Sequence, residues 1–182
     1  MASSAKPDYP WFSLVEGDHI AQGDILEGCP VFSPPKELAE HDLESNATIP
    51  FTCFSPDVIV MSQSCDLEKG REAVGEVLFC RVWTPADFRV GIFSKANDWE
   101  NARKGRMPRF HILPGCELPG NQREARVVDF RRVYSLPLDF VRTRAAAAPR
   151  IRLMPPYREH LSQAFARFFM RVGLPSDIPP FR

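Results

Sequence analysis

The residues with the clearest chemical potential in this sequence are a thiol and a carboxylate, Cys65 and Asp66, in the stretch SQSCD. They follow residues 58–61, an apolar run that predicts a buried strand. A thiol is a nucleophile only as the thiolate, which needs a nearby histidine, arginine or helix N-terminus. The adjacent carboxylate opposes that ionisation, so an activating group would have to come from elsewhere in the chain.

The histidines that could activate the thiol are His19, His41, His111 and His160. His111 is the best placed of them, because its segment RFHILP predicts a strand. Cys65, Asp66 and His111 therefore form a candidate catalytic set for a thiol-dependent hydrolase. The hydrogen bonds to a developing oxyanion would come from the polar residues before the thiol, Ser62, Gln63 and Ser64.

Two other interpretations of SQSCD stay open. Short polar side chains after a strand bond to the backbone and form turns, so the stretch could be a structural corner in which Asp66 caps a turn. Alternatively, zinc could recruit Cys65, Cys80, Cys116 and His111, although no spacing requires it. We predict no metal or cofactor. The surroundings of three further thiols, Cys29, Cys53 and Cys80, indicate core positions.

Charge is distributed unevenly along the chain. Residues 1–70 carry three Lys and Arg against twelve Asp and Glu, whereas residues 71–182 carry twenty against eleven, and eighteen of those twenty are Arg. Clustered arginines can grip phosphates, with Trp99 or Phe110 available for base stacking. The candidate binding residues are Arg103, Arg106, Arg109, Arg131 and Arg132. The alternative is that the basic half packs on the acidic half.

Composition limits the class of protein. With 182 residues, 44% of them hydrophobic, the chain suits a single domain with a substantial core. Its longest apolar runs are far shorter than a membrane-spanning helix, and its start lacks the apolar region of a secretory signal, so we expect a cytoplasmic protein without membrane contact. Five cysteines, with no CxxC pair, argue against both a disulfide framework and a zinc ribbon.

Eighteen prolines divide the chain into short pieces, which favours a mainly β (α+β) fold. We expect a single domain over residues 1–182, with a β-rich core over 20–155, a C-terminal helix over 156–173 and a tail over 174–182. The core is predicted to be a small SH3-like or related barrel, or a bent antiparallel sheet, with a helical insertion within residues 94–105. Phe165, Phe168 and Phe169 should lie on the apolar face of the C-terminal helix.

Three segments, QGDI, VIVMSQSCDL and VVDFRRVYSLPLDF, resemble the barrel strands of the PemK/MazF-type toxins. The resemblance implies an SH3-like barrel and a toxin-type ribonuclease activity, but the thiol and the C-terminal helix depart from that family. The SQSCDL string is also similar to uncharacterised bacterial proteins with an SQ(S/T)CD(L/I) motif, for which no activity is implied.

These observations lead to two functional hypotheses. The first is a small bacterial binding module of a mobile-element, toxin–antitoxin or phage-defence system, which contacts nucleic acid or a protein partner through its Arg-rich half. The second is an enzyme, either a toxin-type ribonuclease or a thiol-dependent hydrolase centred on Cys65. The first is favoured, because no complete catalytic set can be assembled from the residues.

Overall fold

The structure is a computed structural model that describes residues 10–40, 43, 48–89, 93 and 95–170. Within these residues the strands are β1 (Phe12–Val15), β2 (Asp24–Leu26), β3 (Val31–Ser33), β4 (Thr52–Phe54), β5 (Asp57–Val60), β6 (Glu76–Trp83), β7 (Phe110–Leu113), β8 (Arg126–Pro137) and β9 (Arg150–Leu153). The helices are η1 (Ser64–Leu67, a 3-10 turn), α2 (Pro85–Arg89), α3 (Ala96–Arg103), α4 (Leu138–Ala146) and α5 (Tyr157–Phe169).

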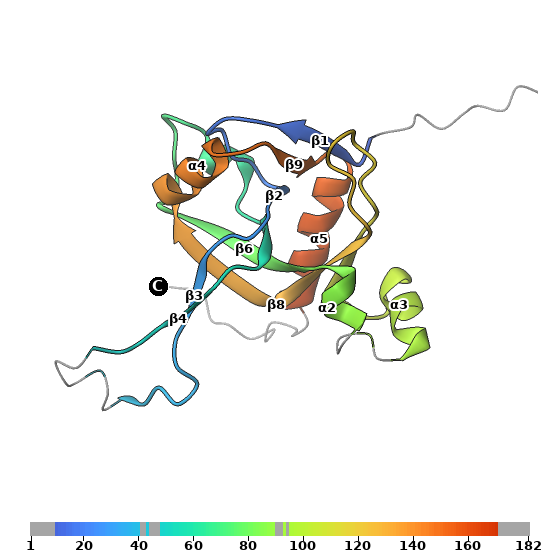
Figure 1. Cartoon of the computed structure of the whole chain (residues 1–182), viewed down its shortest axis with the longest axis horizontal. Helices are drawn as coiled ribbons and strands as arrows, with labels where there is room; N and C mark the ends of the chain where they lie inside the picture. The colour runs from blue at the N-terminus through green and yellow to red at the C-terminus, as the bar shows by residue number, and fades with distance from the viewer. Residues whose placement is uncertain (1–9, 41–42, 44–47, 90–92, 94, 171–182) are drawn as a thin grey trace, which may run out of the picture.

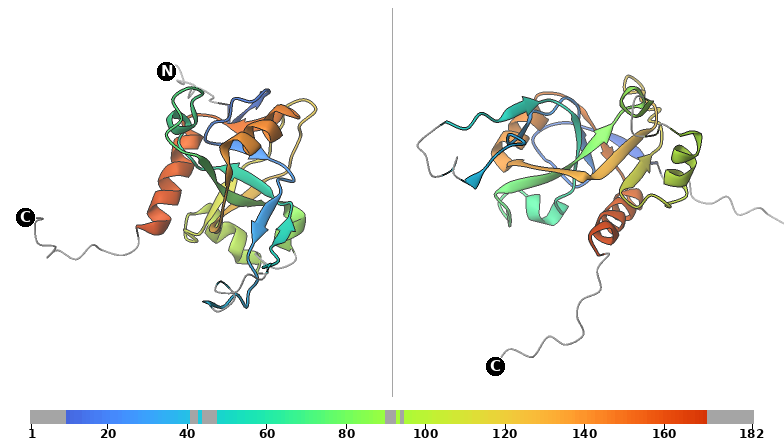
Figure 2. Two further views of the ribbon diagram at one scale, coloured as in Figure 1. Left: turned by 90° about the vertical axis from the view of Figure 1, so that its left-hand side faces the viewer. Right: turned by 90° about the horizontal axis from the view of Figure 1, so that it is seen from below.

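The main element is a seven-stranded antiparallel sheet in the described part of the chain, with strand order β1-β9-β2-β5-β6-β8-β7. The sheet curls into a half-barrel, with α4 and α5 at different sides of it (Figure 1). A separate pair, β3 and β4, projects from this body as an arm, as the views in Figure 2 show. The predicted mainly β fold, with a bent sheet, mid-chain helices and a C-terminal helix, is confirmed.

Strand β5 lies at the centre of the sheet because its residues are apolar on both faces. Val58, Ile59 and Val60 are each 0% exposed. Val58 and Val60 pack in one hydrophobic cluster, whereas Ile59 packs in the other, which includes Leu161 of α5. The uninterrupted apolar run is thus explained by two cores that meet at one strand.

Helix α5 packs on the second of these clusters. Phe165 and Phe168 contact it and lie 5.4 and 6.1 Å from the ring of Phe130, measured between ring centroids. Phe169, which was predicted to be a core residue, is the last residue of α5 and is 59% exposed. The predicted helix over 156–173 is observed as Tyr157–Phe169, and residues 171–182, including the predicted tail, lie outside the described residues.

The mid-chain insertion contains α3 as predicted, and also α2, which was not predicted. Helix α4 was likewise missed. Its nine residues bury Leu138, Val141 and Ala145, which recur at intervals of three and four and pack beneath the sheet. The segment is too short, and too rich in arginine, for this periodicity to stand out from the sequence alone.

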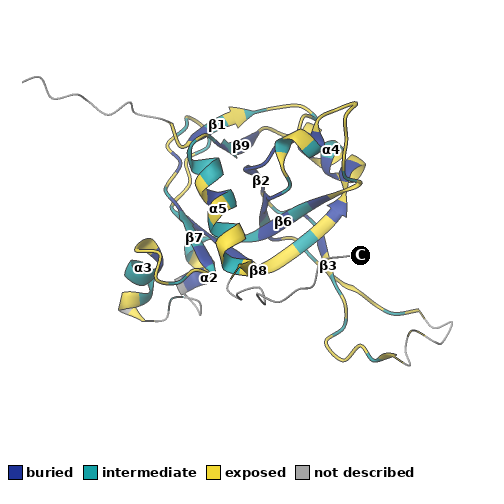
Figure 3. Ribbon diagram, turned by 180° about the vertical axis from the view of Figure 1, so that it is seen from behind, coloured by how far each residue is buried: buried dark blue, intermediate teal, exposed yellow. Residues whose placement is uncertain are grey.

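The β3–β4 arm exposes one side chain that was predicted to lie in a core, that of Cys53. Cys53 is exposed, because it lies opposite Phe32 on the outward face of the two-stranded ribbon. Phe32 is itself 55% exposed. Seen from behind, the loop that joins β3 to β4 is largely exposed while β2 is buried (Figure 3). None of the helices in the described residues has the length and apolar character needed to cross a membrane.

Candidate functional site

The SQSCD stretch follows β5 and runs into η1, and its serines hold the corner that it forms in place. Ser62 Oγ accepts a hydrogen bond from the backbone N–H of Leu78 in β6 at 2.8 Å. Ser64 Oγ accepts one from the backbone N–H of Gln22 at 3.1 Å. Leu67, at the end of η1, is 1% exposed and anchors the turn in the core. Both hydroxyls therefore fix long-range contacts, which is the structural role that the sequence left open.

The corner packs directly against the QGDI segment. Gln22 is 5% exposed, and its Nε2 donates to the carbonyl of Met61 at 2.8 Å. The backbone N–H of Gly23 donates to the carbonyl of Val60 at 2.9 Å. Strands β2 and β5 are antiparallel neighbours, so the chain entering β2 and the chain leaving β5 meet at one end of the sheet.

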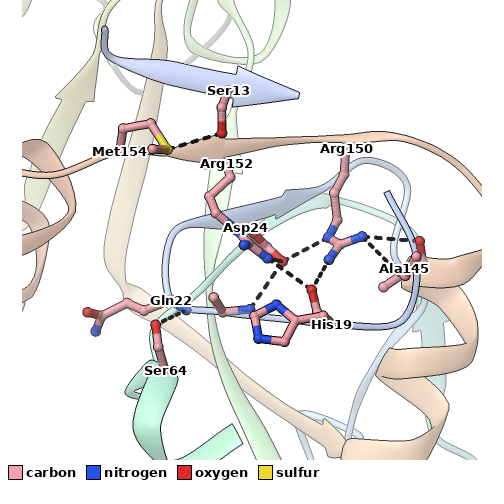
Figure 4. A network of polar contacts seen from close by, with 11 residues as sticks. Ser13, His19, Gln22, Asp24, Ser64, Ala145, Arg150, Arg152 and Met154 are labelled. Carbon is pink, nitrogen blue, oxygen red and sulfur yellow. Dashed lines mark hydrogen bonds and ion pairs between the residues drawn. The ribbon is translucent and has the colours of Figure 1, made fainter. Parts of the chain in front are cut away.

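A buried carboxylate supports this contact from behind (Figure 4). Asp24 is 0% exposed and binds two arginines of β9, Arg150 at 2.8 Å and Arg152 through both carboxylate oxygens. Further guanidinium N–H groups donate to backbone carbonyls, those of Gly17 and Ala145 from Arg150 and that of His19 from both arginines, and no buried polar side-chain atom of these three residues lacks a partner. The network is therefore satisfied, and it fixes the loop that carries His19 and Gln22.

An open, mostly polar cavity of about 340 Å³ lies between the corner and α5. Its lining residues are Gln22, Gln63, Ser64, Cys65, Arg158, Glu159, Ser162 and Gln163. Cys65 is exposed, and its thiol lies 3.6 Å from Asp66 Oδ1, to which it can donate. Gln63 Nε2 donates to Ser162 Oγ at 3.4 Å, so Gln63 bridges the corner to α5.

One ion pair supplies the formal charges of this cavity. Arg158 Nη2 lies 2.8 Å from Glu159 Oε1. Burial acts to raise the pKa of Glu159, but the hydrogen bonds from Arg158 and from its own backbone N–H, together with the charges of Arg158 and His160, outweigh it and the pKa is lowered. The second carboxylate oxygen, Glu159 Oε2, is buried and has no hydrogen-bond partner in the described part of the chain. Arg158 is a positive group of the kind that could stabilise a Cys65 thiolate, but it is already paired with the carboxylate of Glu159.

His111 lies elsewhere in the fold. It sits on the edge strand β7, with its ring 6.3 Å from that of Phe130, and burial lowers its pKa to about 4, with the charge of His160 acting in the same direction. Strands β6 and β8 separate β7 from β5, so the structure does not bring His111 to Cys65. The imidazole beside the corner is that of His19, whose Nε2 lies 3.7 Å from Glu68, the residue after η1.

The remaining thiols do not gather with Cys65. Cys80 and Cys116 belong to the buried cluster beneath α5, and Cys29 to the other buried cluster. Burial raises the pKa of Cys29 to about 11 and that of Cys80 to about 12. Among the described residues, no group of three or more His, Cys, Asp or Glu side chains is arranged to hold a metal ion.

Among the described residues, ion pairs join the acidic and basic halves of the sequence at two carboxylates. Asp24 forms ion pairs with Arg150 and Arg152, as described above. Glu27 forms ion pairs with Arg123, at 2.7 Å, and with Arg126, at 3.2 Å. For these arginines the packing alternative is confirmed, and the uneven charge of the sequence is partly neutralised inside the molecule.

Two of the arginines proposed as binding residues also have carboxylate partners. Arg103 makes a bidentate pair with Glu100, with both contacts at 2.8 Å. Arg131 binds both oxygens of Asp129, at 3.1 and 3.2 Å. Asp129 is 1% exposed, whereas the Arg131 side chain remains 47% exposed, so the buried carboxylate orients a guanidinium that still faces solvent.

The other binding candidates, Arg106, Arg109 and Arg132, have no carboxylate partner within the described residues. The guanidinium of Arg109 lies over the ring of Phe110 at 4.6 Å, and that of Arg131 lies 5.6 Å from the same ring. Phe110 is only 4% exposed, and Trp99 packs against Phe88, at 5.6 Å between centroids. The two aromatic residues expected to stack on bases are therefore committed to a small core.

A bulge in β8 presents two of these arginines to solvent. Arg81 of β6 pairs with Asp129, but the preceding residue of β6 pairs with Val133. The intervening residues of β8, Phe130, Arg131 and Arg132, thus have no partner in β6. Phe130 turns into the core, while both arginines are exposed. Bulges of this kind redirect side chains and are common next to functional sites.

Comparison of the chain with protein-family models, with curated proteins and with solved structures finds no match in any of the three.

Proposed function

We propose that this protein is a binding module that contacts the phosphate backbone of a nucleic acid through the arginines around the β8 bulge. The observation that carries the proposal is the bulge itself, which leaves Arg131 and Arg132 exposed, with Arg131 and Arg109 both beside the ring of Phe110. Arginine suits phosphate because its planar fork matches the phosphate oxygens. The buried Asp129 holds Arg131 in a defined orientation, which reduces the entropy lost on binding.

The distribution of ion pairs among the arginines also supports this surface as the binding site. Arginines elsewhere in the basic half, such as Arg123 and Arg150, neutralise carboxylates of the acidic half. Arg106, Arg109 and Arg132 have no such partner within the described residues, and their positive charge is available to a ligand. Arg81, whose guanidinium lies 3.5 Å from the ring centroid of Trp83, extends the basic surface along β6.

The test is binding of fluorescent single-stranded RNA, single-stranded DNA and duplex DNA at two or more salt concentrations. We expect binding at low salt that weakens steeply as salt rises. Arg132→Glu should weaken binding about tenfold and reduce the salt slope by about one to two phosphate contacts. Arg167→Glu, the same charge change at an exposed position of α5, is the matched control and should change binding much less.

Two results would count against the proposal. One is the absence of binding to all three probes at low salt. The other is an equal loss of affinity in the Arg132 and Arg167 variants, because that would indicate a general effect of net charge. The other ligand considered for the basic half is a protein partner. It would then need to be sought by methods that do not depend on phosphate.

A second candidate function rests on Cys65, the thiol that is both exposed and part of a polar cavity. A thiol-dependent enzyme requires a reactive thiolate, so under this hypothesis Cys65 should be alkylated faster than a free cysteine peptide at neutral pH. The rate can be followed by mass spectrometry, with the exposed Cys53 as an internal control. If Cys65 and Cys53 react alike at every pH, the enzyme hypothesis fails.

A further inference from the structure

A second cavity, with several charged residues in its lining, lies at one end of the curled sheet, away from the SQSCD corner. Four neighbouring strands each contribute one residue to it: Glu27 follows β2, Asp57 begins β5, Thr84 follows β6 and Arg126 begins β8. The cavity has a volume of about 240 Å³, and its remaining lining residues are Pro85, Arg123 and Glu124. Ligand sites are common at the mouths of β-barrels, where the strands end.

Arg126 is the unusual residue of this cavity. It is 2% exposed and donates from Nη1 to Glu27 Oε1 at 3.2 Å. Its other two nitrogens, Nε and Nη2, are buried and have no hydrogen-bond partner in the described part of the chain. Leaving charged donors buried and unpaired is costly, so native proteins rarely retain them without a reason.

Those two nitrogens form the edge of a guanidinium that grips an oxyanion through parallel hydrogen bonds. Arg123 uses the same edge on Glu27, with Nε and Nη2 at 2.7 and 2.9 Å from the two carboxylate oxygens. Glu27 is therefore already occupied by Arg123, and the hydrogen bond from Arg123 lowers the pKa of Glu27. The matching edge of Arg126 has no such acceptor in the chain described.

The charged residues that line the cavity are Arg123 and Arg126 against Glu27, Asp57 and Glu124, so an anion on Arg126 is best accommodated when one of these carboxyls is protonated. Arg123 and Glu27 balance one another. Asp57 accepts a hydrogen bond from the backbone N–H of Gly28 at 3.0 Å, and no ion pair joins it to Arg126 within the described residues. Burial raises the pKa of Asp57, and the negative charges of Glu27 and Asp87 act in the same direction, against Gly28 and Arg126. Burial likewise lowers the pKa of Arg126.

We propose that this cavity binds a small oxyanion, the carboxylate or phosphate group of a ligand, on the Nε and Nη2 edge of Arg126. The anion supplies the acceptor that the chain lacks. Asp57 faces Glu27 and Arg126 across the cavity, and it also faces Asp87 of α2. A proton taken up by the carboxyl of Asp57 therefore removes a negative charge next to the ligand. Binding is therefore coupled to proton uptake and strengthens as pH falls.

The test is an NMR titration of the full chain in which the side-chain Nε–H signal of Arg126 is observed. Sodium phosphate and sodium acetate are the two probes, and sodium chloride controls for ionic strength. We expect a saturable shift of the Arg126 signal with phosphate or acetate but not with chloride. The probe that acts at the lower concentration identifies which of the two oxyanions the site prefers.

Matched variants sharpen this test. Arg126→Lys keeps the charge but loses the fork and should weaken binding about tenfold or more, the size expected for a lost charge-assisted hydrogen bond. Arg71→Lys, the same change at an exposed residue outside the cavity, should bind as the wild type does. Asp57→Asn should bind with little dependence on pH, because it mimics the protonated carboxyl.

The proposal is wrong if neither anion shifts the Arg126 signal, or if Arg126→Lys binds the preferred anion as tightly as the wild type. Should the lysine variant fail to fold, the titration of the wild-type side chain decides alone. The result is independent of nucleic-acid binding, because Arg126 is buried whereas the arginines of the β8 bulge are exposed.

Discussion

The backbone N–H of Gln22 donates a hydrogen bond to Ser64 Oγ at 3.1 Å, and the bond joins residues 42 positions apart. Ser64→Ala should lower the free energy of unfolding by about 1–3 kcal/mol, because it leaves a buried amide without an acceptor. Gln63→Ala, at the exposed neighbouring position, should change it by less than about 0.5 kcal/mol. Urea denaturation of both variants measures the difference. Equal effects would show that the hydrogen bond between Gln22 and Ser64 does not stabilise the fold.

This corner illustrates what a sequence can and cannot predict. The apolar run before Cys65 predicted β5 and the turn after it, because burial and turn formation are local properties of the chain. The partner of Ser64 was not predictable, since the hydroxyl bonds to a segment brought near only by the pairing of β2 with β5. Composition and spacing carry little information about such non-local neighbours.

The histidine chosen from the sequence shows the same limit. His111 was favoured because its segment predicts a strand, and the strand is present as β7. Strand order, which local patterns do not encode, places β7 at the edge of the sheet and puts the loop of His19 next to the corner instead. Arg126 escaped notice for a related reason: its burial and its unpaired nitrogens are consequences of packing.

Removing the carboxylate of Asp24 should be among the most destabilising single changes in this protein. Asp24→Asn leaves Arg150 and Arg152 close together without a counter-charge, and breaking a buried pair of this kind costs about 3–5 kcal/mol. Asp18→Asn, which breaks a surface pair with Lys69, should cost much less, because solvent screens an exposed pair. Thermal and urea unfolding of the two variants would reveal a structural Asp24, and similar losses in both would contradict that role.

Protonation of His111 should destabilise the fold in mildly acidic solution. Burial lowers its pKa from 6.5 in the unfolded chain to about 4 in the folded protein. The unfolded chain therefore binds more protons between these values, so the free energy of unfolding falls as pH drops from about 6.5 towards 4. The contribution is fully present above the unfolded pKa.

The variant His111→Gln isolates this effect, because glutamine does not titrate. We expect the loss of stability between pH 7 and 5 to be smaller in His111→Gln than in the wild type, as measured by urea unfolding at a series of pH values. His19→Gln, at an exposed histidine, should keep the wild-type dependence. An unchanged pH profile in the His111 variant would mean that other groups govern acid sensitivity.

Gly23 combines two constraints that a matched pair of variants can separate. Its φ is 88°, and a Cβ at this position would lie 3.0 Å from the carbonyl oxygen of Leu153 and 3.1 Å from its Cβ. Gly17 has a similar φ of 81°, but a Cβ there would meet nothing within 4 Å. Gly17→Ala thus measures the backbone strain alone, about 1–2 kcal/mol for a left-handed residue.

Gly23→Ala should cost more than Gly17→Ala by about 1–3 kcal/mol, the usual range for overpacking, because β9 must move away from the QGDI segment. That movement would disturb the contact between Gln22 and the SQSCD corner, so the alanine at residue 23 should also raise the exchange rate of the Gln22 amide proton. Hydrogen exchange followed by NMR measures this directly. Equal stabilities of the two alanine variants, with Gln22 unaffected, would show that the close approach to Leu153 has no energetic consequence.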